Sequence, residues 1–165
     1  MTWLVIAMAC LLGVAGCTRS YVDPAVQVYG SVRDLADASW VVVVGTPVAS
    51  HVEAGDDSHA DTMVTTVDVE QVVKSRPGFN VGGTVVVSQP VGATVDDYPP
   101  VLVHGSRYLL YLVGDDTQST VMFMVGGAAG QWIGVEQSDP GVFVQVRSDP
   151  LNDLPRSLTV DAALG

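Results

Sequence analysis

Short valine-rich runs separated by glycine, aspartate and proline constrain the fold of this chain more than any other feature. Valine makes up about a fifth of the 165 residues, and β-branched side chains favour pleated, half-buried strands. Some runs alternate apolar and polar residues, whereas others are apolar at every position, as in strands buried on both faces. About seven strands are expected in this way, at residues 40–44, 63–70, 84–88, 108–113, 121–125, 132–135 and 142–146.

The order of these runs predicts an all-β fold. No long helix is expected between them, so the strands should pair mainly antiparallel, in a barrel or a β-sandwich. A short helix is expected before the first strand. Ser31 can cap it, Asp34 stands at the capping-box position, and Val32, Leu35 and Ala36 share one face.

The first seventeen residues carry an export pattern. The apolar run from Trp3 to Val14 is shorter than the roughly 20 residues that a spanning helix needs. It ends in Val14-Ala15-Gly16-Cys17, which resembles the lipobox of bacterial lipoproteins. The resemblance implies that Cys17 receives a diacylglyceryl group and that the chain is cut before it. An ordinary secretory signal, or a buried helix with a chance cysteine, is the alternative.

This interpretation divides the chain into four parts. Residues 1–16 form a lipoprotein signal peptide, 17–30 the lipidated cysteine and a tether, 31–147 the β-domain, and 148–165 an irregular C-terminal strap. Cys10 leaves with the signal and Cys17 carries lipid, so the mature domain has no disulfide, thiolate metal site or cysteine nucleophile. Several acyl chains anchor a protein firmly, which predicts a location on the extracytoplasmic face of the cell membrane.

The charge balance argues against a nucleic-acid partner. The chain has 7 basic and 18 acidic side chains, a formal net charge of −11. A phosphate backbone requires clustered lysine and arginine. Three of the few aromatic residues, Trp40, Tyr108 and Tyr111, lie in apolar runs and are expected in the core.

The order of features from Ser31 to Val135 resembles the TIMP/netrin-like module. The likeness rests on residues 35–48, a short helix, alanine-aspartate and strand; on 65–74, a threonine-to-lysine strand; on 105–112, with Gly105-Ser106-Arg107-Tyr108-Leu109; and on the glycine-rich stretch 126–132. The resemblance implies a small OB-like closed barrel. Animal inhibitors of this class bind a protease zinc through a free N-terminal cysteine, a mechanism that acylation of Cys17 would block. A protease-inhibitor-like module that acts through a loop edge stays an alternative.

One acidic loop is a candidate metal site. It contains His51, Glu53, Asp56, Asp57, His59 and Asp61. Imidazole and carboxylate groups can hold Zn²⁺, which makes His51, Asp57, His59 and Asp61 the candidate ligands of a metal-dependent envelope hydrolase. The spacing is neither HExxH nor a calcium loop, and acidic clusters are usually solvated. We therefore expect no metal and no cofactor.

The remaining residues that could take part in catalysis are better explained as parts of turns. Asp96-Asp97 and Asp115-Asp116 flank turn signals, where aspartate hydrogen-bonds locally. His104 is not expected to activate a serine nucleophile, because the sequence contains no G-x-S-x-G motif. The stretch 126–130 is expected to be a wide turn with positive φ. The sequence thus predicts a non-catalytic binding barrel with an unknown ligand, the membrane as one partner and an extracytoplasmic protein as a possible second.

Overall fold

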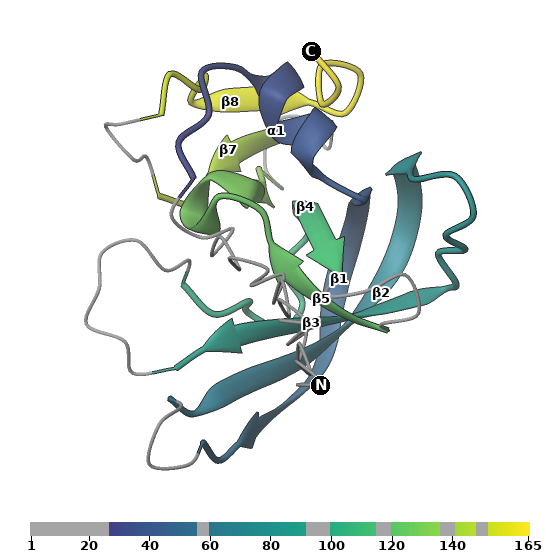
Figure 1. The fold of residues 1–165 in the computed structure, drawn as a ribbon, viewed down its shortest axis with the longest axis vertical. Helices are drawn as coiled ribbons and strands as arrows, with labels where there is room; N and C mark the ends of the chain where they lie inside the picture. The colour runs from purple at the N-terminus through teal and green to yellow at the C-terminus, as the bar shows by residue number, and fades with distance from the viewer. Residues whose placement is uncertain (1–26, 56–59, 92–99, 115–119, 136–140, 148–151) are drawn as a thin grey trace, which may run out of the picture.

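The computed structural model describes residues 27–55, 60–91, 100–114, 120–135, 141–147 and 152–165 (Figure 1). The described chain consists of one short α-helix, one 3₁₀ turn and strands, which confirms the all-β prediction. The elements are α1 Val32–Ala38, β1 Val41–Glu53, β2 Thr62–Ser75, β3 Thr84–Pro90, β4 Tyr108–Gly114, β5 Val121–Met124, η2 Gly127–Gly130, β6 Gln131–Gly134, β7 Val142–Gln145 and β8 Ser157–Thr159.

Five of the strands close into a barrel. They pair in the order β1-β2-β3-β5-β4, and β4 returns to pair with β1. Every pairing is antiparallel except the one between β3 and β5, where Val86 and Val87 lie beside Val121 and Met122 in parallel. The closed OB-like barrel is therefore confirmed, and the β-sandwich alternative is wrong.

Strand β1 pairs with both β2 and β4, and so closes the barrel, because it bends. Its residues 41–45 pair with β4 as well as with β2, whereas its remaining residues pair with β2. Three irregularities interrupt the β1–β2 register, as expected of bulges, which bend and twist a strand. At one of them, a Cβ on Gly45 would lie 2.5 Å from the carbonyl oxygen of Asp68. Glycine is required there because the two backbones approach so closely.

The unbroken apolar runs reflect burial on two faces. Val41 and Val43 point into the barrel with Leu110 and Leu112. Val42 and Val44 point outward, into a second core with Leu109 and Tyr111 of β4. This outer core also contains residues of α1, η2 and the strands β6, β7 and β8. Figure 1 shows α1, β7 and β8 close together near the C-terminus. Both parities of β1 and β4 are apolar because each side chain enters one of these cores.

Helix α1 forms for the reason that the sequence indicates. The side-chain oxygen of Ser31 accepts a hydrogen bond from the Asp34 amide, and its hydroxyl donates to the Asp34 carboxylate. Val32, Leu35 and Ala36 are buried against the outer core. The predicted N-cap and apolar face are confirmed.

The glycine-rich stretch 126–130 connects two strands, β5 and β6, that pair one after the other with the same edge of β4. Val125 still bonds to Tyr111, and Gln131 then lies opposite Leu110. The five residues between them form a wide turn that begins with positive φ at Gly126 and Gly127. The expected positive-φ turn is confirmed, and Trp132 fixes it by donating its indole N–H to the carbonyl of Ala129 at 2.9 Å.

Both ends of the domain differ from the sequence interpretation. The segment expected to be an irregular strap contains β8, which pairs antiparallel with β7. Tyr29, assigned above to the tether, is only 3% exposed and belongs to the outer core. These short segments lack a pattern of their own, because the core that buries them is built by distant residues.

Candidate functional site

A tight turn after β2 brings an arginine and an aromatic ring together. The sequence Arg76-Pro77-Gly78-Phe79 forms it, with the Phe79 amide donating to the Arg76 carbonyl at 3.1 Å. Gly78 has φ +81°. Proline and then a positive-φ glycine at the two central positions define a type II turn. The hydroxyl of Ser75 also donates to the Phe79 carbonyl at 2.7 Å, which fixes the turn against the end of β2.

Trp40 is held opposite this turn by backbone bonds on two sides. Its amide donates to the Leu112 carbonyl at 2.9 Å, and its carbonyl accepts from the Arg76 amide at 2.7 Å. The preceding residue, Ser39, ends α1 by donating its hydroxyl to the Leu35 carbonyl at 2.7 Å. The end of α1 and the end of β2 therefore position the indole together.

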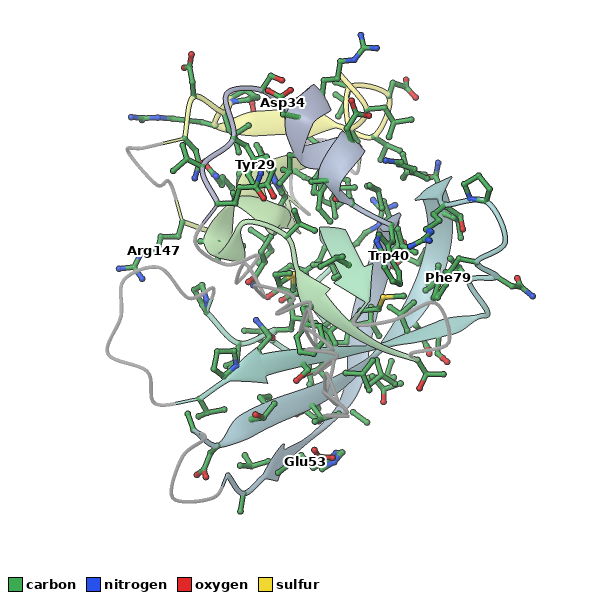
Figure 2. The ribbon with its side chains drawn as sticks, viewed as in Figure 1. Tyr29, Asp34, Trp40, Glu53, Phe79 and Arg147 are labelled. Atoms are coloured by element: carbon green, nitrogen blue, oxygen red, sulfur yellow. The ribbon has the colours of Figure 1, made fainter. Side chains whose placement is uncertain are left out.

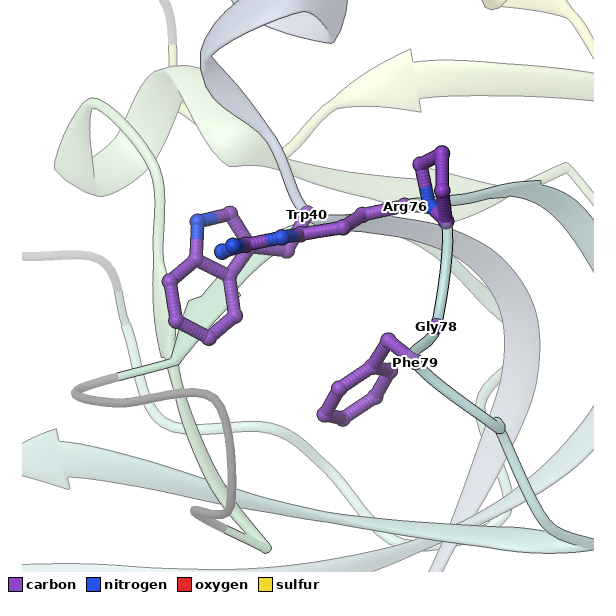
Figure 3. A pocket seen from close by; sticks show the side chains of 5 residues that line it. Trp40, Arg76, Gly78 and Phe79 are labelled. Atoms are coloured by element: carbon purple, nitrogen blue, oxygen red, sulfur yellow. The ribbon is translucent and has the colours of Figure 1, made fainter.

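The three side chains enclose a small hollow (Figure 3). The guanidinium carbon of Arg76 lies 4.2 Å from the centre of the Trp40 ring, a cation–π contact. The rings of Trp40 and Phe79 are 6.4 Å apart and meet edge to face at 61°. The hollow has a volume of about 210 Å³, opens to solvent, and is lined by Trp40, Arg76, Pro77, Gly78 and Phe79.

The electrostatics of this aromatic–arginine pocket differ from those of the chain as a whole. Among the described residues, no carboxylate lies within salt-bridge distance of the Arg76 guanidinium, although the chain carries a net charge of −11. The neighbouring cation, Lys74, donates to the Ala36 carbonyl at the C-terminal end of α1. Within the part of the chain that the structure describes, Arg76 therefore presents its charge to the hollow and not to an acidic partner.

Tyr108 and Tyr111 are buried in the core as expected, whereas the prediction for Trp40 holds only in part, because Trp40 packs against the inner core without being a fully buried member of it. Trp40 is only partly buried and contributes its ring to the pocket. Figure 2 shows Trp40 beside Phe79, with Glu53 far away at the other end of the barrel strands. The sequence reasoning missed the site, although a Pro-Gly pair between an arginine and a phenylalanine is a signature of such a turn.

A serine and a histidine meet at a different place on the barrel. The Ser50 hydroxyl and the His104 Nε2 are 2.8 Å apart on the surface. A histidine that activates a serine is usually oriented by a third group, and no acidic side chain bonds to His104 within the described ranges. The contact ties the segment before β4 to β1, which the bond from the Gly105 amide to the Pro47 carbonyl also does.

The candidate metal ligands are only partly described. His51 and Glu53 lie on β1 and not in a loop, and the His51 Nε2 is 3.3 Å from the Glu53 carboxylate. Asp61 accepts a hydrogen bond from the Gly55 amide at 3.0 Å. In the described part of the chain, no three metal-ligating side chains come together. Asp57 and His59 lie outside it.

A charged cluster on the barrel surface joins β1 and β2 to the residue that precedes β4. The Arg107 Nε donates to the Glu70 carboxylate at 2.6 Å, and the Thr46 hydroxyl donates to the same group at 2.8 Å. Partial burial raises the Glu70 pKa, but these two bonds and the charge of Arg107 outweigh it, so the pKa is lowered. The Arg107 guanidinium also lies 5.3 Å from the centre of the Phe143 ring. The cluster therefore connects β1 and β2 to the start of β4.

Several predicted features lie outside the described residues. They are the signal peptide at 1–16, Cys17 with the tether as far as residue 26, Asp56, and the acid pairs Asp96-Asp97 and Asp115-Asp116. Within the ranges that the structure describes, no helix has the length and apolar character to cross a membrane.

The fold and the pocket define this molecule as an OB-like barrel with an aromatic–arginine hollow. No protein-family model matches the sequence. The curated proteins contain no significant match to it either.

Proposed function

We propose that the protein is a membrane-anchored, extracytoplasmic lipoprotein whose OB-like barrel acts as a non-catalytic binding module. The anchor is proposed from the sequence 13–17, in which small residues precede Cys17 at the end of a short apolar run. The binding role is proposed from the aromatic–arginine pocket. It combines a cation, two rings and a hollow, as small-molecule sites commonly do.

The pocket is the observation that carries the binding role. Among the described residues no carboxylate pairs with Arg76, and its guanidinium carbon lies 4.2 Å from the centre of the Trp40 ring, beside an open hollow. The turn and the end of α1 fix the backbone from which both side chains project, and the contact between them brings the guanidinium to the ring. A preorganised site loses less conformational entropy on binding, which supports a recognition role.

The lipid anchor is tested by metabolic labelling with an alkyne analogue of palmitate in a bacterial host that processes lipoproteins. The wild-type protein and the Cys17→Ala variant are compared after detergent extraction. We expect the label on the wild type and its loss in Cys17→Ala. Cys10→Ala is the matched control, because this cysteine leaves with the signal and its removal should preserve labelling. Equal labelling of wild type and Cys17→Ala would refute the anchor.

A further inference from the structure

We infer that the aromatic–arginine pocket binds a small organic anion that carries a flat unsaturated ring, such as an aromatic carboxylate. This inference rests on the proposed binding function and names its ligand class. It depends on the cation, the two rings and the size of the hollow, each of which restricts the ligand independently.

The cation selects a negative group. The guanidinium of Arg76 has five N–H donors in a planar fork that matches a carboxylate. Its guanidinium carbon lies 4.2 Å from the centre of the Trp40 ring, and among the described residues no acceptor bonds to its N–H groups, so these donors are available for hydrogen bonds. The contact with the ring also removes part of the water shell of the guanidinium, which strengthens a charge-assisted hydrogen bond to an anion.

The rings select a flat apolar body next to that charge. Trp40 and Phe79 line the hollow from two directions, with their ring planes at 61°. A planar ring can contact the face of one and the edge of the other, which are the favoured arrangements of aromatic pairs. A fully hydrated inorganic anion would gain nothing from these apolar walls.

The size limits the ligand to about one ring. The hollow of about 210 Å³ is smaller than the 300–1,000 Å³ that drug-sized ligands occupy. A ligand of roughly ten heavy atoms is expected to bind weakly, with a dissociation constant on the order of 1 mM. Benzoate has the right size and both required groups.

The test is a titration of the full-length protein in detergent, followed through its indole N–H signals by NMR. Benzoate is compared with benzyl alcohol, which has the ring without the charge, and with acetate, which has the charge without the ring. Ionic strength is kept constant with sodium chloride. Trp40→Phe assigns the Trp40 signal, and the signal of Trp132, which is buried and bonded to Ala129, reports whether the fold is intact.

We expect benzoate to shift the Trp40 signal at concentrations at least tenfold lower than either partial analogue. Arg76→Gln should raise the dissociation constant of benzoate roughly tenfold or more, since a hydrogen bond to a charged group is lost. Arg76→Lys keeps the charge without the planar fork and should fall between. Arg33→Gln removes the same charge from an exposed position on α1 and should bind as the wild type does.

Each other outcome overturns a defined part of the inference. Equal shifts with benzyl alcohol and benzoate would refute the anionic class while the pocket stayed a binding site. Equal shifts with acetate and benzoate would refute the requirement for a ring. No shift of Trp40 with any probe, with the Trp132 signal in place, would overturn both the ligand class and the binding role. Palmitate labelling of Cys17 would decide the anchor separately.

Discussion

Replacing Tyr111 with phenylalanine tests whether the C-terminal segment is an integral part of the barrel. Tyr111 lies on β4, is 0% exposed, and donates its hydroxyl to the carbonyl of Ala163 at 2.8 Å. Burial raises the pKa of this hydroxyl above its ordinary value of 10.0, so it stays a protonated donor at neutral pH. The bond connects residues that are 52 positions apart. It therefore exists only if the last turn of the chain packs on β4.

The magnitude follows from what the substitution removes. Phenylalanine keeps the ring and its packing, so the loss is one hydrogen bond, worth about 1 kcal/mol. The carbonyl of Ala163 would then be left in the buried environment without this donor, which adds a desolvation cost. Together these effects predict a loss of about 1–3 kcal/mol in the free energy of unfolding.

The assay is urea unfolding of the full-length protein in detergent, followed by tryptophan fluorescence. Tyr29→Phe is the matched control, because Tyr29 is also a buried tyrosine, yet its hydroxyl has no hydrogen-bond partner in the described part of the chain. We expect Tyr111→Phe to lower the urea midpoint and Tyr29→Phe to leave it nearly unchanged. Equal midpoints for the two variants would refute the docking of the C-terminal turn on β4.

Three further predictions concern other parts of the fold. Gly78→Ala should lower the free energy of unfolding by about 1 kcal/mol, because its φ of +81° disfavours a Cβ. Gly82→Ala is the control and should not destabilise the protein, since no atom lies within 4 Å of the new Cβ. Equal urea midpoints for the two variants would contradict this. Gly126→Ala should cost about 2–4 kcal/mol by thermal unfolding, since it combines positive φ with a tyrosine ring 2.7 Å from the new Cβ. Glu70→Gln should lose less than about 1 kcal/mol at neutral pH, because the pair with Arg107 is exposed. The pKa of Glu70 in the folded protein lies below 4.5, so the stabilisation by the Glu70 carboxylate is present above pH 4.5 and is lost as the pH falls through the folded pKa. A difference in stability between wild type and Glu70→Gln that persists in strong acid would contradict this.

Local signals in the sequence predicted the elements whose cause is local. Ser31 and Asp34 cap α1 as expected, because a capping box needs only residues three positions apart. The runs that begin at Val41 and Tyr108 are strands buried on both faces. A strand that is apolar at every position has two apolar faces, and each of them must be buried in a core. Their lengths were predicted less well. β1 extends to Glu53 because pairing with β2 continues through exposed residues that belong to no apolar run.

The pocket could not be predicted from periodicity. Trp40 begins an apolar run and was therefore expected in the core, yet the end of α1 and the type II turn after β2 place it at the edge of the inner core, where it is only partly buried and contacts Arg76. The encounter of Ser50 with His104, which are 54 positions apart, was not expected either. Contacts of this kind depend on how bulged strands bend, and a single sequence does not specify that curvature.

The sequence by itself determined the class of fold and the proposal of a lipid anchor at Cys17, since both depend on residue type and short spacing. Only the tertiary structure decided that the sheet closes through a parallel β3–β5 pairing, that Tyr29 and β8 complete the outer core, and that Trp40, Arg76 and Phe79 form a pocket. The physical reason is separation along the chain. Hydrophobic burial and backbone pairing join segments that carry no mutual signal until the barrel brings them together.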